Sequence, residues 1–546
     1  MYGRIHWLKE VLADATETRP IILCEYAYAK GNAGGNFKKY WELVDSFPSF
    51  QGGFIWDWHD KALTFTLPDG RKAWGYGGDL GCDTDYAAIN EHPTQVLNGI
   101  VAPDLTPHPG AWEVKQVQAP VAFTATEESL RQGVVTVHNK HQFLDLGHLE
   151  LRWEVTEDGR AVQSGRLPMP AVPADEQADI SLPITAITAP QAGAEYWLNL
   201  RAVLAADQPW AEQGHDITWA QFALPCHKAG GTVSPTGMPV LTLERADDAF
   251  VISGEKVRVV FDRATGLMTS FRGTGPELLL AGPKDNFYRA PTDNDFQLGS
   301  PYSYWQDWVK TGLNHLQRTA TTVEAAQLSA TMAVVQVNAT YQGTAEEPAF
   351  RTSTRYTVYG SGEVAVECTV RASEALVTIP RIGVELVLPA DFEQLAWYGC
   401  GPYETYPDRK ASAQVGRYAG TVAEQFEPLF IWPGECGGKE DVRWAALTDG
   451  AGYGLLVAGA PTFHFDALHY PLDALTTAQH NYELVARPEI YLHLDARHMG
   501  LGGDTGWTRN VHPEYLIGPG TYQYTLRLRP LGPDDDPAEL ARVTIE

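Results

Sequence analysis

Cysteine is scarce in this chain of 546 residues, which has six cysteines and no pair in a Cys-x-x-Cys spacing. That scarcity argues against a zinc ribbon, a thioredoxin-like motif and a disulfide-rich secreted scaffold. Long apolar runs are also missing, because the N-terminal segment has no signal-like apolar stretch and no 18 consecutive apolar residues occur. We therefore expect a soluble, cytoplasmic protein that does not enter a membrane.

Positive charge is in short supply as well. The chain has 41 Lys and Arg against 68 Asp and Glu, which gives a formal net charge of −27. A nucleic-acid backbone or an anionic lipid surface requires a basic footprint, so neither is an expected partner. Apolar residues make up 44% and charged residues 20% of the chain, which is typical of a globular protein. The length predicts two to four domains.

Several common catalytic motifs do not occur. There is no GxSxG, GxxxxGK[ST] or HExxH, so serine-hydrolase, P-loop and zincin chemistry lack their usual signals. Aromatic residues, in contrast, are abundant, with 16 Trp and 24 Tyr. Such an excess is typical of large β-sheet cores, and it also occurs in platforms on which sugar rings pack.

The first 120 residues differ in pattern from the rest. Residues 5–12 predict a short helix, and the apolar run over residues 20–24 predicts a parallel strand buried on both faces. Apolar residues at spacings of three and four over residues 37–47 predict a helix that Pro48 ends. A second buried strand over residues 50–58 would complete a βαβ unit.

Beyond residue 120 the pattern becomes one of strands and turns. Alternation over residues 134–138 and 196–204 predicts strands of an immunoglobulin-like sandwich, and residues 229–237 read as a linker. The remainder predicts a β-supersandwich of two long sheets, with a hairpin turn at residues 261–266. The expected fold class is thus multidomain and mainly β. Its predicted parts are a partial (β/α)8 barrel (1–120), an immunoglobulin-like sandwich (121–228) and a large supersandwich (229–546).

Glu25 is the strongest candidate for a catalytic residue. It ends a strand that we predict to be buried and parallel, and the catalytic residues of barrel enzymes lie at the carboxyl ends of such strands. A solvent-facing strand-end glutamate is the competing interpretation. Trp56, Asp57 and Trp58 close the second strand, as a sugar platform or as packing. His493 and His498, five residues apart in an expected strand, we interpret as structural histidines.

Seven ordered motifs resemble the family 2 β-galactosidases of the large tetrameric bacterial type, and together they extend along the whole chain. They are RPIILCEYAYAKGNAGGNFKKYW (19–41), QGGFIWDW (51–58), YGGD (76–79), NGIVAPDLTPHP (98–109), FYRAPTDND (287–295), GCGPYETYPDR (399–409) and RHMGLGGDTGW (497–507).

The resemblance implies retaining hydrolysis of terminal β-galactosides by two carboxylates. It gives roles to individual residues by their positions in these motifs. They are Glu25 as nucleophile, Tyr2 as its hydrogen-bonding partner, Trp56 in the galactose pocket, Asn98 near the sugar and as a sodium ligand, Gln95 where a second sodium ligand is expected, and Trp507 as the platform for the aglycone.

Two departures from the family pattern bear on function. The family motif EYAHAMGN reads EYAYAKGN here, so Tyr28 replaces a histidine that contacts the galactose hydroxyls. Met1 also falls at an internal methionine of the family, which implies that the general acid/base glutamate and the magnesium ligands precede this chain. A (β/α)8 barrel needs about 250 residues, and only about 120 barrel-like residues are present, so we expect self-association or a complementing N-terminal chain to cover the open edge.

Three hypotheses for function follow from these observations. The first is β-galactoside hydrolysis with Glu25 as nucleophile. The second is a non-catalytic complementing or carbohydrate-binding fragment. The third is a repurposed hydrolase, for example of activated esters, that uses the opened cleft.

Overall fold

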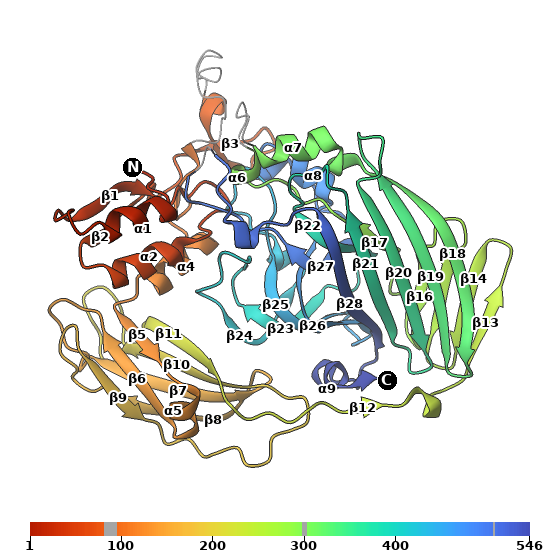
Figure 1. The fold of residues 1–546 in the computed structure, drawn as a ribbon, viewed down its shortest axis with the longest axis horizontal. Helices are drawn as coiled ribbons and strands as arrows, with labels where there is room; N and C mark the ends of the chain where they lie inside the picture. The colour runs from red at the N-terminus through yellow and green to blue at the C-terminus, as the bar shows by residue number, and fades with distance from the viewer. Residues whose placement is uncertain (81–95, 297–302, 506–507) are drawn as a thin grey trace.

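The structure is a computed structural model that describes residues 1–80, 96–296, 303–505 and 508–546. Three groups of elements can be followed in Figure 1. A small mixed α/β group lies at the upper left, a β-sandwich lies below it, and a strongly curled sheet of long strands fills the rest. The chain is mainly β, as the sequence predicts.

The N-terminal group contains the predicted βαβ unit. Strands β1 and β2 pair in parallel, with Ile21 opposite Phe50 and Tyr26 opposite Ile55. Leu23 and Phe50 bury one face of the pair against the helices. The bounds are α1 (Ile5–Ala13), β1 (Ile21–Tyr26), α2 (Phe37–Ser46), β2 (Phe50–Ile55), β3 (Leu63–Thr66), β4 (Lys72–Gly75), the 3-10 turn η1 (Gly77–Leu80) and α4 (Pro109–Val117).

The prediction that the first strand is buried on both faces is wrong. Ile22 is 55% exposed, and Cys24 is also exposed. Phe54 on β2 is 68% exposed. Helices cover only one face of this pair, so the other presents apolar side chains to solvent.

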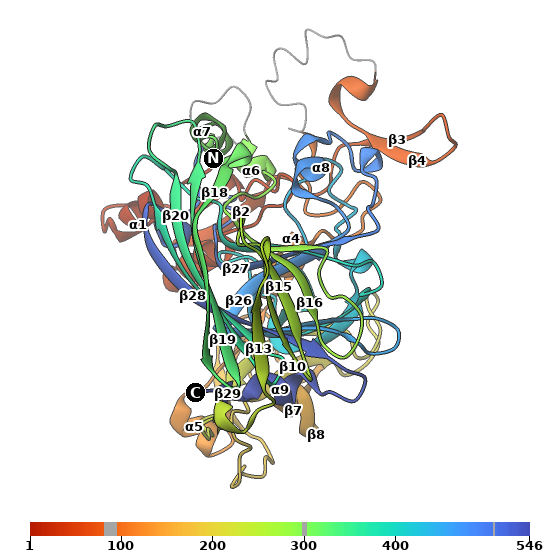
Figure 2. The ribbon, with the colours of Figure 1, turned by 90° about the vertical axis from the view of Figure 1, so that its right-hand side faces the viewer.

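The hairpin formed by β3 and β4 lies at the edge of the molecule beside α8 (Leu472–Thr477), as Figure 2 shows. A turn at Asp69–Gly70 joins its two strands. Phe65 packs edge-on against Tyr482, with ring centroids 5.9 Å apart. The hairpin therefore rests on the C-terminal part of the chain.

The middle of the chain forms a sandwich of a four-stranded sheet (β11-β10-β7-β8) and a three-stranded sheet (β5-β6-β9). The alternation predicted over residues 196–204 matches the burial pattern of β10 except at Val203, which is also buried. The inward side chains of β10 pack into one core with Trp153 and Val135. The bounds are β5 (Val121–Thr124), α5 (Glu127–Arg131), β6 (Val134–Asn139), β7 (Leu149–Glu157), β8 (Arg160–Pro168), β9 (Gln177–Ser181), β10 (Tyr196–Leu204) and β11 (Asp216–Ala223).

The C-terminal part is built on one sheet of twelve strands, faced by the four-stranded sheet β13-β14-β15-β16 across a shared core. The prediction of two long sheets is therefore corrected to one long, curled sheet and one short sheet. The strands are β12 (Thr232–Val233), β13 (Leu241–Arg245), β14 (Ala249–Gly254), β15 (Arg258–Asp262), β16 (Met268–Arg272), β17 (Ala281–Asn286), β18 (Gln317–Ser329), β19 (Met332–Gln342), β20 (Phe350–Tyr359), β21 (Val364–Ala372), β22 (Arg381–Leu388), β23 (Gln394–Gly401), β24 (Gln414–Thr421), β25 (Lys439–Thr448), β26 (Gly454–Leu468), β27 (Ile490–His498), β28 (Gly520–Leu531) and β29 (Thr544–Ile545).

Short helices lie at the ends of these strands. They are α6 (Asp293–Phe296), α7 (Tyr304–Thr311), α8 and α9 (Pro537–Arg542). None of the helices in the described ranges combines the length and apolar character needed to cross a bilayer.

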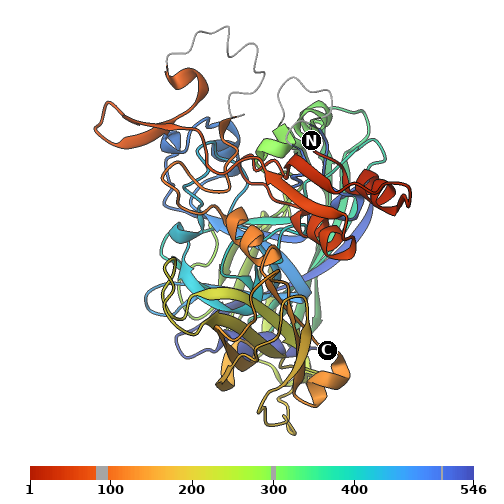
Figure 3. The same cartoon turned by 90° about the vertical axis from the view of Figure 1, so that its left-hand side faces the viewer.

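Loops of the C-terminal part hold the N-terminal group in place. Figure 3 shows the N-terminal group beside these loops and above the sandwich. The backbone N–H of Gly35 donates to the Gly502 carbonyl at 2.8 Å. The buried carboxylate of Glu113 on α4 accepts from the backbone N–H groups of Ala411 and Ser412 at 3.1 and 2.9 Å. The position of the N-terminal loops is thus set by residues hundreds of positions away.

Candidate functional site

Glu25 lies at the carboxyl end of β1, and Tyr2 contacts it twice. The Tyr2 backbone N–H donates to the Glu25 carbonyl at 2.8 Å, and the Tyr2 phenol hydrogen-bonds the Glu25 side chain. Burial, followed by the hydrogen bond and the charge of Glu25, raises the pKa of Tyr2 well above its usual range. The phenol therefore stays protonated at neutral pH and acts as a hydrogen-bond donor to the carboxylate.

The backbone on both sides of this contact is strained. Tyr2 has a φ of 51° and Ala27, two residues after Glu25, a φ of 48°. Non-glycine residues seldom adopt positive φ, and such residues concentrate at functional sites, where the surrounding contacts hold them. The strain supports a functional role for this strand end.

Tyr28 and Asn98 join the group from neighbouring loops. The Asn98 amide donates to the Tyr28 hydroxyl at 3.3 Å, and the Tyr28 and Tyr2 rings meet edge to face with centroids 6.0 Å apart. Burial raises the pKa of Tyr28, against the hydrogen bond from Asn98. Tyr28, which replaces the family histidine, therefore presents a neutral hydroxyl to the same group of side chains as Glu25.

Lys61 organises the other side of the group. Its ammonium lies 2.6 Å from the Asp57 carboxylate, donates to Asn98 Oδ1 at 2.8 Å and lies 5.6 Å from the Trp56 ring centroid. Burial opposes ionisation of Asp57, but hydrogen bonds from Lys61 and the Trp58 backbone lower its pKa. The Trp56 side chain is 38% exposed, so part of its ring is available to a ligand.

The resemblance names Asn98 as a sodium ligand. In the structure the Asn98 side-chain oxygen accepts from the Lys61 ammonium at 2.8 Å, and the sodium assignment stays a prediction. Gln95 lies outside the described residues.

Sequence reasoning missed Lys30 and Asp293. The Lys30 side chain is 2% exposed, and its ammonium lies 3.9 Å from the Asp293 carboxylate on α6. Burial lowers the pKa of Lys30 to about 8, and the charge of Asp293 only partly offsets this effect. The signal was available in the lysine of EYAYAKGN, which stands where the family motif has methionine.

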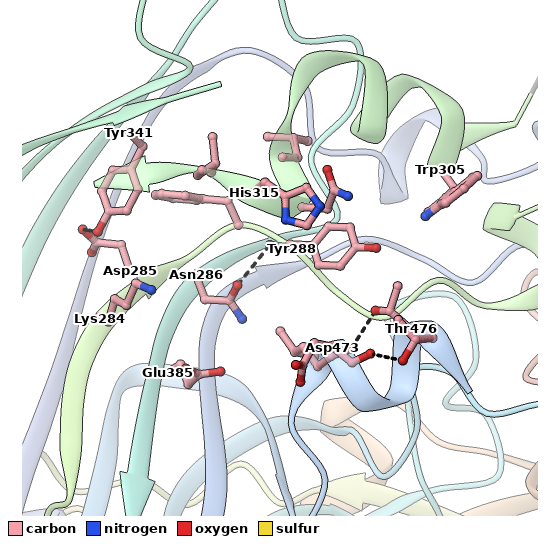
Figure 4. A pocket seen from close by; sticks show the side chains of 16 residues that line it. Lys284, Asp285, Asn286, Tyr288, Trp305, His315, Tyr341, Glu385, Asp473 and Thr476 are labelled. Atoms are coloured by element: carbon pink, nitrogen blue, oxygen red, sulfur yellow. Dashed lines mark hydrogen bonds between the residues drawn. The ribbon is translucent and has the colours of Figure 1, made fainter. Parts of the chain in front are cut away.

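The structure thus gathers Tyr2, Glu25, Tyr28, Trp56 and Asn98 at one end of the β1–β2 pair. Trp507 lies outside the described residues. No residue of this group lines the cavity of about 500 Å³ in Figure 4, which lies between β17, α7 and α8. The candidate site is therefore the strand end and its loops.

Comparison with known proteins identifies the family. The family model described as "Glycosyl hydrolases family 2, TIM barrel domain" matches residues 1–123. "Beta-galactosidase, domain 4" matches residues 135–225, and "Beta galactosidase small chain" matches residues 253–528. These three models follow the order of the three structural groups and define a family 2 glycosyl hydrolase.

Relatives narrow the assignment further. A β-galactosidase of Vibrio cholerae serotype O1 is 39% identical over 530 residues, which are 96% of this chain and 49% of that protein. A β-galactosidase of Priestia megaterium is 34% identical over 521 residues, 94% of this chain and 48% of that protein. The chain belongs to the β-galactosidases of family 2, and it spans about half the length of these relatives.

A galactose 1-epimerase of Lactobacillus acidophilus is similar in structure over 54% of this chain and 99% of its own. The TM-score is 0.27 and the sequence identity 9%. Values this low support no inference about this chain.

Proposed function

We propose that this chain hydrolyses terminal β-D-galactosides with retention of configuration and that Glu25 is the nucleophile. The observation that carries the proposal is the strand-end carboxylate that a buried, protonated Tyr2 contacts through its side chain. The β-galactosidase relatives support galactose as the sugar.

In the proposed mechanism the Glu25 carboxylate attacks the anomeric carbon as the glycosidic bond breaks, and the product is a glycosyl ester. Water then cleaves this ester and releases galactose with its original configuration. The Tyr2 phenol holds the carboxylate in orientation before attack. Tyr28 and Asn98 would bind sugar hydroxyls, and the exposed part of the Trp56 ring would pack on the sugar face.

A retaining enzyme needs a second carboxyl group about 5–5.5 Å from the nucleophile as acid and base. We propose that a complementary N-terminal chain supplies it. The exposed apolar side chains of Ile22 and Phe54 support this arrangement, because they lie on the face of the β1–β2 pair that the helices leave open. On its own, the chain would then serve as a complementing subunit with an incomplete site.

A mechanism-based label tests the assignment. The chain is incubated with 2,4-dinitrophenyl 2-deoxy-2-fluoro-β-D-galactoside, alone and with the N-terminal half of the Vibrio cholerae relative, and peptides are analysed by mass spectrometry. We expect the label on Glu25 and its loss in Glu25→Gln, whereas Glu42→Gln, on an exposed face of α2, should label as the wild type does. Absence of label on Glu25 in both mixtures refutes the assignment.

The same two mixtures test complementation. Hydrolysis of an aryl galactoside should rise at least about 10²-fold when the N-terminal half is added, because general acid–base catalysis contributes about 10²–10⁴-fold. Equal rates with and without that half contradict the complementing role and leave the labelling result as a separate finding.

A further inference from the structure

A second group of reactive side chains lies inside the long sheet, apart from Glu25. Glu435, His464 near the end of β26 and His498 at the end of β27 are 3%, 3% and 5% exposed. One ligand atom from each residue, a carboxylate oxygen or a ring nitrogen, lies within 4.8 Å of the other two. Three groups that can each donate an electron pair thus converge in the interior.

His464 is oriented with its Nε2 atom free to bind. Its Nδ1 lies 2.8 Å from the carboxylate of Glu440, which fixes the Nδ1–H tautomer. Its Nε2 is buried and has no hydrogen-bond partner among the described residues. A carboxylate that holds one nitrogen of a histidine while the other stays open is the usual second-shell arrangement of metal-binding histidines.

His498 has the same arrangement. The His498 Nδ1 atom lies 3.0 Å from the Met499 carbonyl oxygen. Because a carbonyl oxygen can only accept, the hydrogen is on Nδ1. The Arg289 guanidinium is farther from His498 Nδ1, at 3.5 Å. The Nε2 therefore carries a lone pair that faces Glu435 Oε1 at 3.4 Å. Within the described ranges this nitrogen also makes no hydrogen bond.

Two nitrogen lone pairs and a carboxylate that face one another in a dry interior repel one another. A cation between them relieves this repulsion, as does a proton on Glu435, whose pKa burial raises to about 7. The surrounding charges do not supply that cation in full. The Arg381 guanidinium lies 3.4 Å from the Glu435 carboxylate. It also pairs with the buried carboxylates of Asp466 and Asp495, at 2.7 and 2.9 Å. His493 adds a second positive charge, because its Nδ1 lies 2.6 Å from Asp466 and the charge of Asp466 raises the pKa of His493 to about 10 against the effect of burial. Two cations thus face three carboxylates.

We propose that Glu435, His464 and His498 bind a divalent transition-metal ion of the zinc class. Two imidazoles and one carboxylate are a donor set that suits zinc, at about 2.0–2.2 Å from each ligand atom. Such distances place neighbouring ligand atoms about 3.3–3.6 Å apart. The 3.4 Å between His498 Nε2 and Glu435 Oε1 already has this value. The His464 ring stacks on the His498 ring with centroids 4.4 Å apart and has to turn before its Nε2 points to the same ion.

A cavity of about 450 Å³ gives access to this group. His464 and His498 line it together with Glu440 and Asp441. Lys410, which lies 2.7 Å from Asp441, and Arg497 also line this cavity, so its wall carries charges of both signs. The ion would keep one coordination position open toward the cavity, where water can bind.

The site also connects to the loops near Glu25. The side-chain amide of Asn32, in the N-terminal group, donates to the backbone carbonyl of Glu435 at 2.7 Å. A metal ion on Glu435 would therefore brace the point at which the N-terminal loops rest on the long sheet. The inference is independent of the proposed function, because none of its ligands belongs to the group around Glu25.

Metal binding is measured on the full 546-residue chain. The protein is stripped with a chelator, reloaded with Zn²⁺ and desalted, and bound zinc is determined by elemental analysis. A second sample is titrated with Co²⁺ and followed by visible absorption. The variants are His464→Gln, His498→Gln and Glu435→Gln, and the matched control is His469→Gln, whose ring nitrogens are both hydrogen-bonded, to Glu393 and Glu489.

We expect about one zinc per chain and visible Co²⁺ bands in the wild type and in the control. Each ligand variant that far-UV circular dichroism shows to be folded should lose at least a factor of ten in metal affinity. A wild type that retains less than about a tenth of an equivalent of zinc and gives no Co²⁺ bands overturns the proposal, even if every variant fails to fold. Equal metal content in the ligand variants and the control also overturns it.

Discussion

Replacement of Arg381 by methionine tests the buried charge network of the long sheet. The Arg381 side chain is fully buried, and its guanidinium lies within 3.4 Å of carboxylates from Asp466, Asp495 and Glu435. Methionine fills most of the same volume but carries no charge. The variant therefore leaves buried carboxylates without their main counter-ion.

Removal of one partner from a buried ion pair costs about 3–5 kcal/mol, because the remaining charge is uncompensated. A folding unit of about 300 residues has an unfolding entropy of about 0.6 kcal/mol/K near its midpoint. The Arg381→Met variant should therefore melt about 5–8 °C below the wild type. Asp495→Asn in the same chain removes one of the unpaired carboxylates and should recover part of this loss.

The assay is thermal unfolding followed by far-UV circular dichroism in the presence of a chelator, so that bound metal does not contribute. Arg355→Met is the control, because Arg355 pairs with Glu367 at 3.6 Å with both side chains about half exposed. Exposed pairs contribute about 0–1 kcal/mol, so this variant should melt within about 2 °C of the wild type. Equal melting temperatures for the two variants would refute the reasoning.

Three further predictions concern the N-terminal group. Gly35→Ala places a methyl group 2.6 Å from the Gly502 carbonyl oxygen and should weaken the contact between these two loops. Limited trypsin digestion should therefore release residues 1–120 faster from this variant than from the control Gly231→Ala, where the added methyl group contacts nothing. Glu113→Gln replaces one of two accepting oxygens by a donor and should destabilise this contact by about 1–3 kcal/mol, measured by hydrogen exchange in α4. The pKa of Lys30 is lowered to about 8, so its buried charge destabilises the fold below pH 8, and this cost declines between pH 8 and 10.5. The melting temperature of the wild type minus that of Lys30→Met should rise over this interval, and a flat difference contradicts the assignment.

Local elements of the fold could be predicted from the sequence because their signals are local. The strand predicted from alternation over residues 196–204 has the bounds of β10, and the apolar spacing after Asn36 corresponds to α2. The first strand was predicted in the right place and with the right parallel partner, but not with the right exposure. An apolar run does not reveal whether a second layer covers it.

The candidate site could be predicted only in part. The resemblance brought Glu25, Tyr2, Tyr28, Trp56 and Asn98 to attention, and the structure places them together; their roles remain predictions. The pairing of Lys30 with Asp293 depends on the way α6 docks against the N-terminal loops, and no short-range pattern records such a contact. His498 was interpreted from the sequence as a structural histidine. Its approach to His464 could not be predicted, since β26 and β27 become neighbours only in the folded sheet.

The docking of the N-terminal loops on the C-terminal part has a consequence for engineering. Asp293 contacts Lys30, and the Gly502 carbonyl accepts from Gly35, so two loops of the C-terminal part hold the segment that follows Glu25. A mutant library limited to residues 1–120 would therefore change only one partner of each of these contacts. Paired libraries that also vary the loop around residue 293 would change both partners of the contact between Lys30 and Asp293.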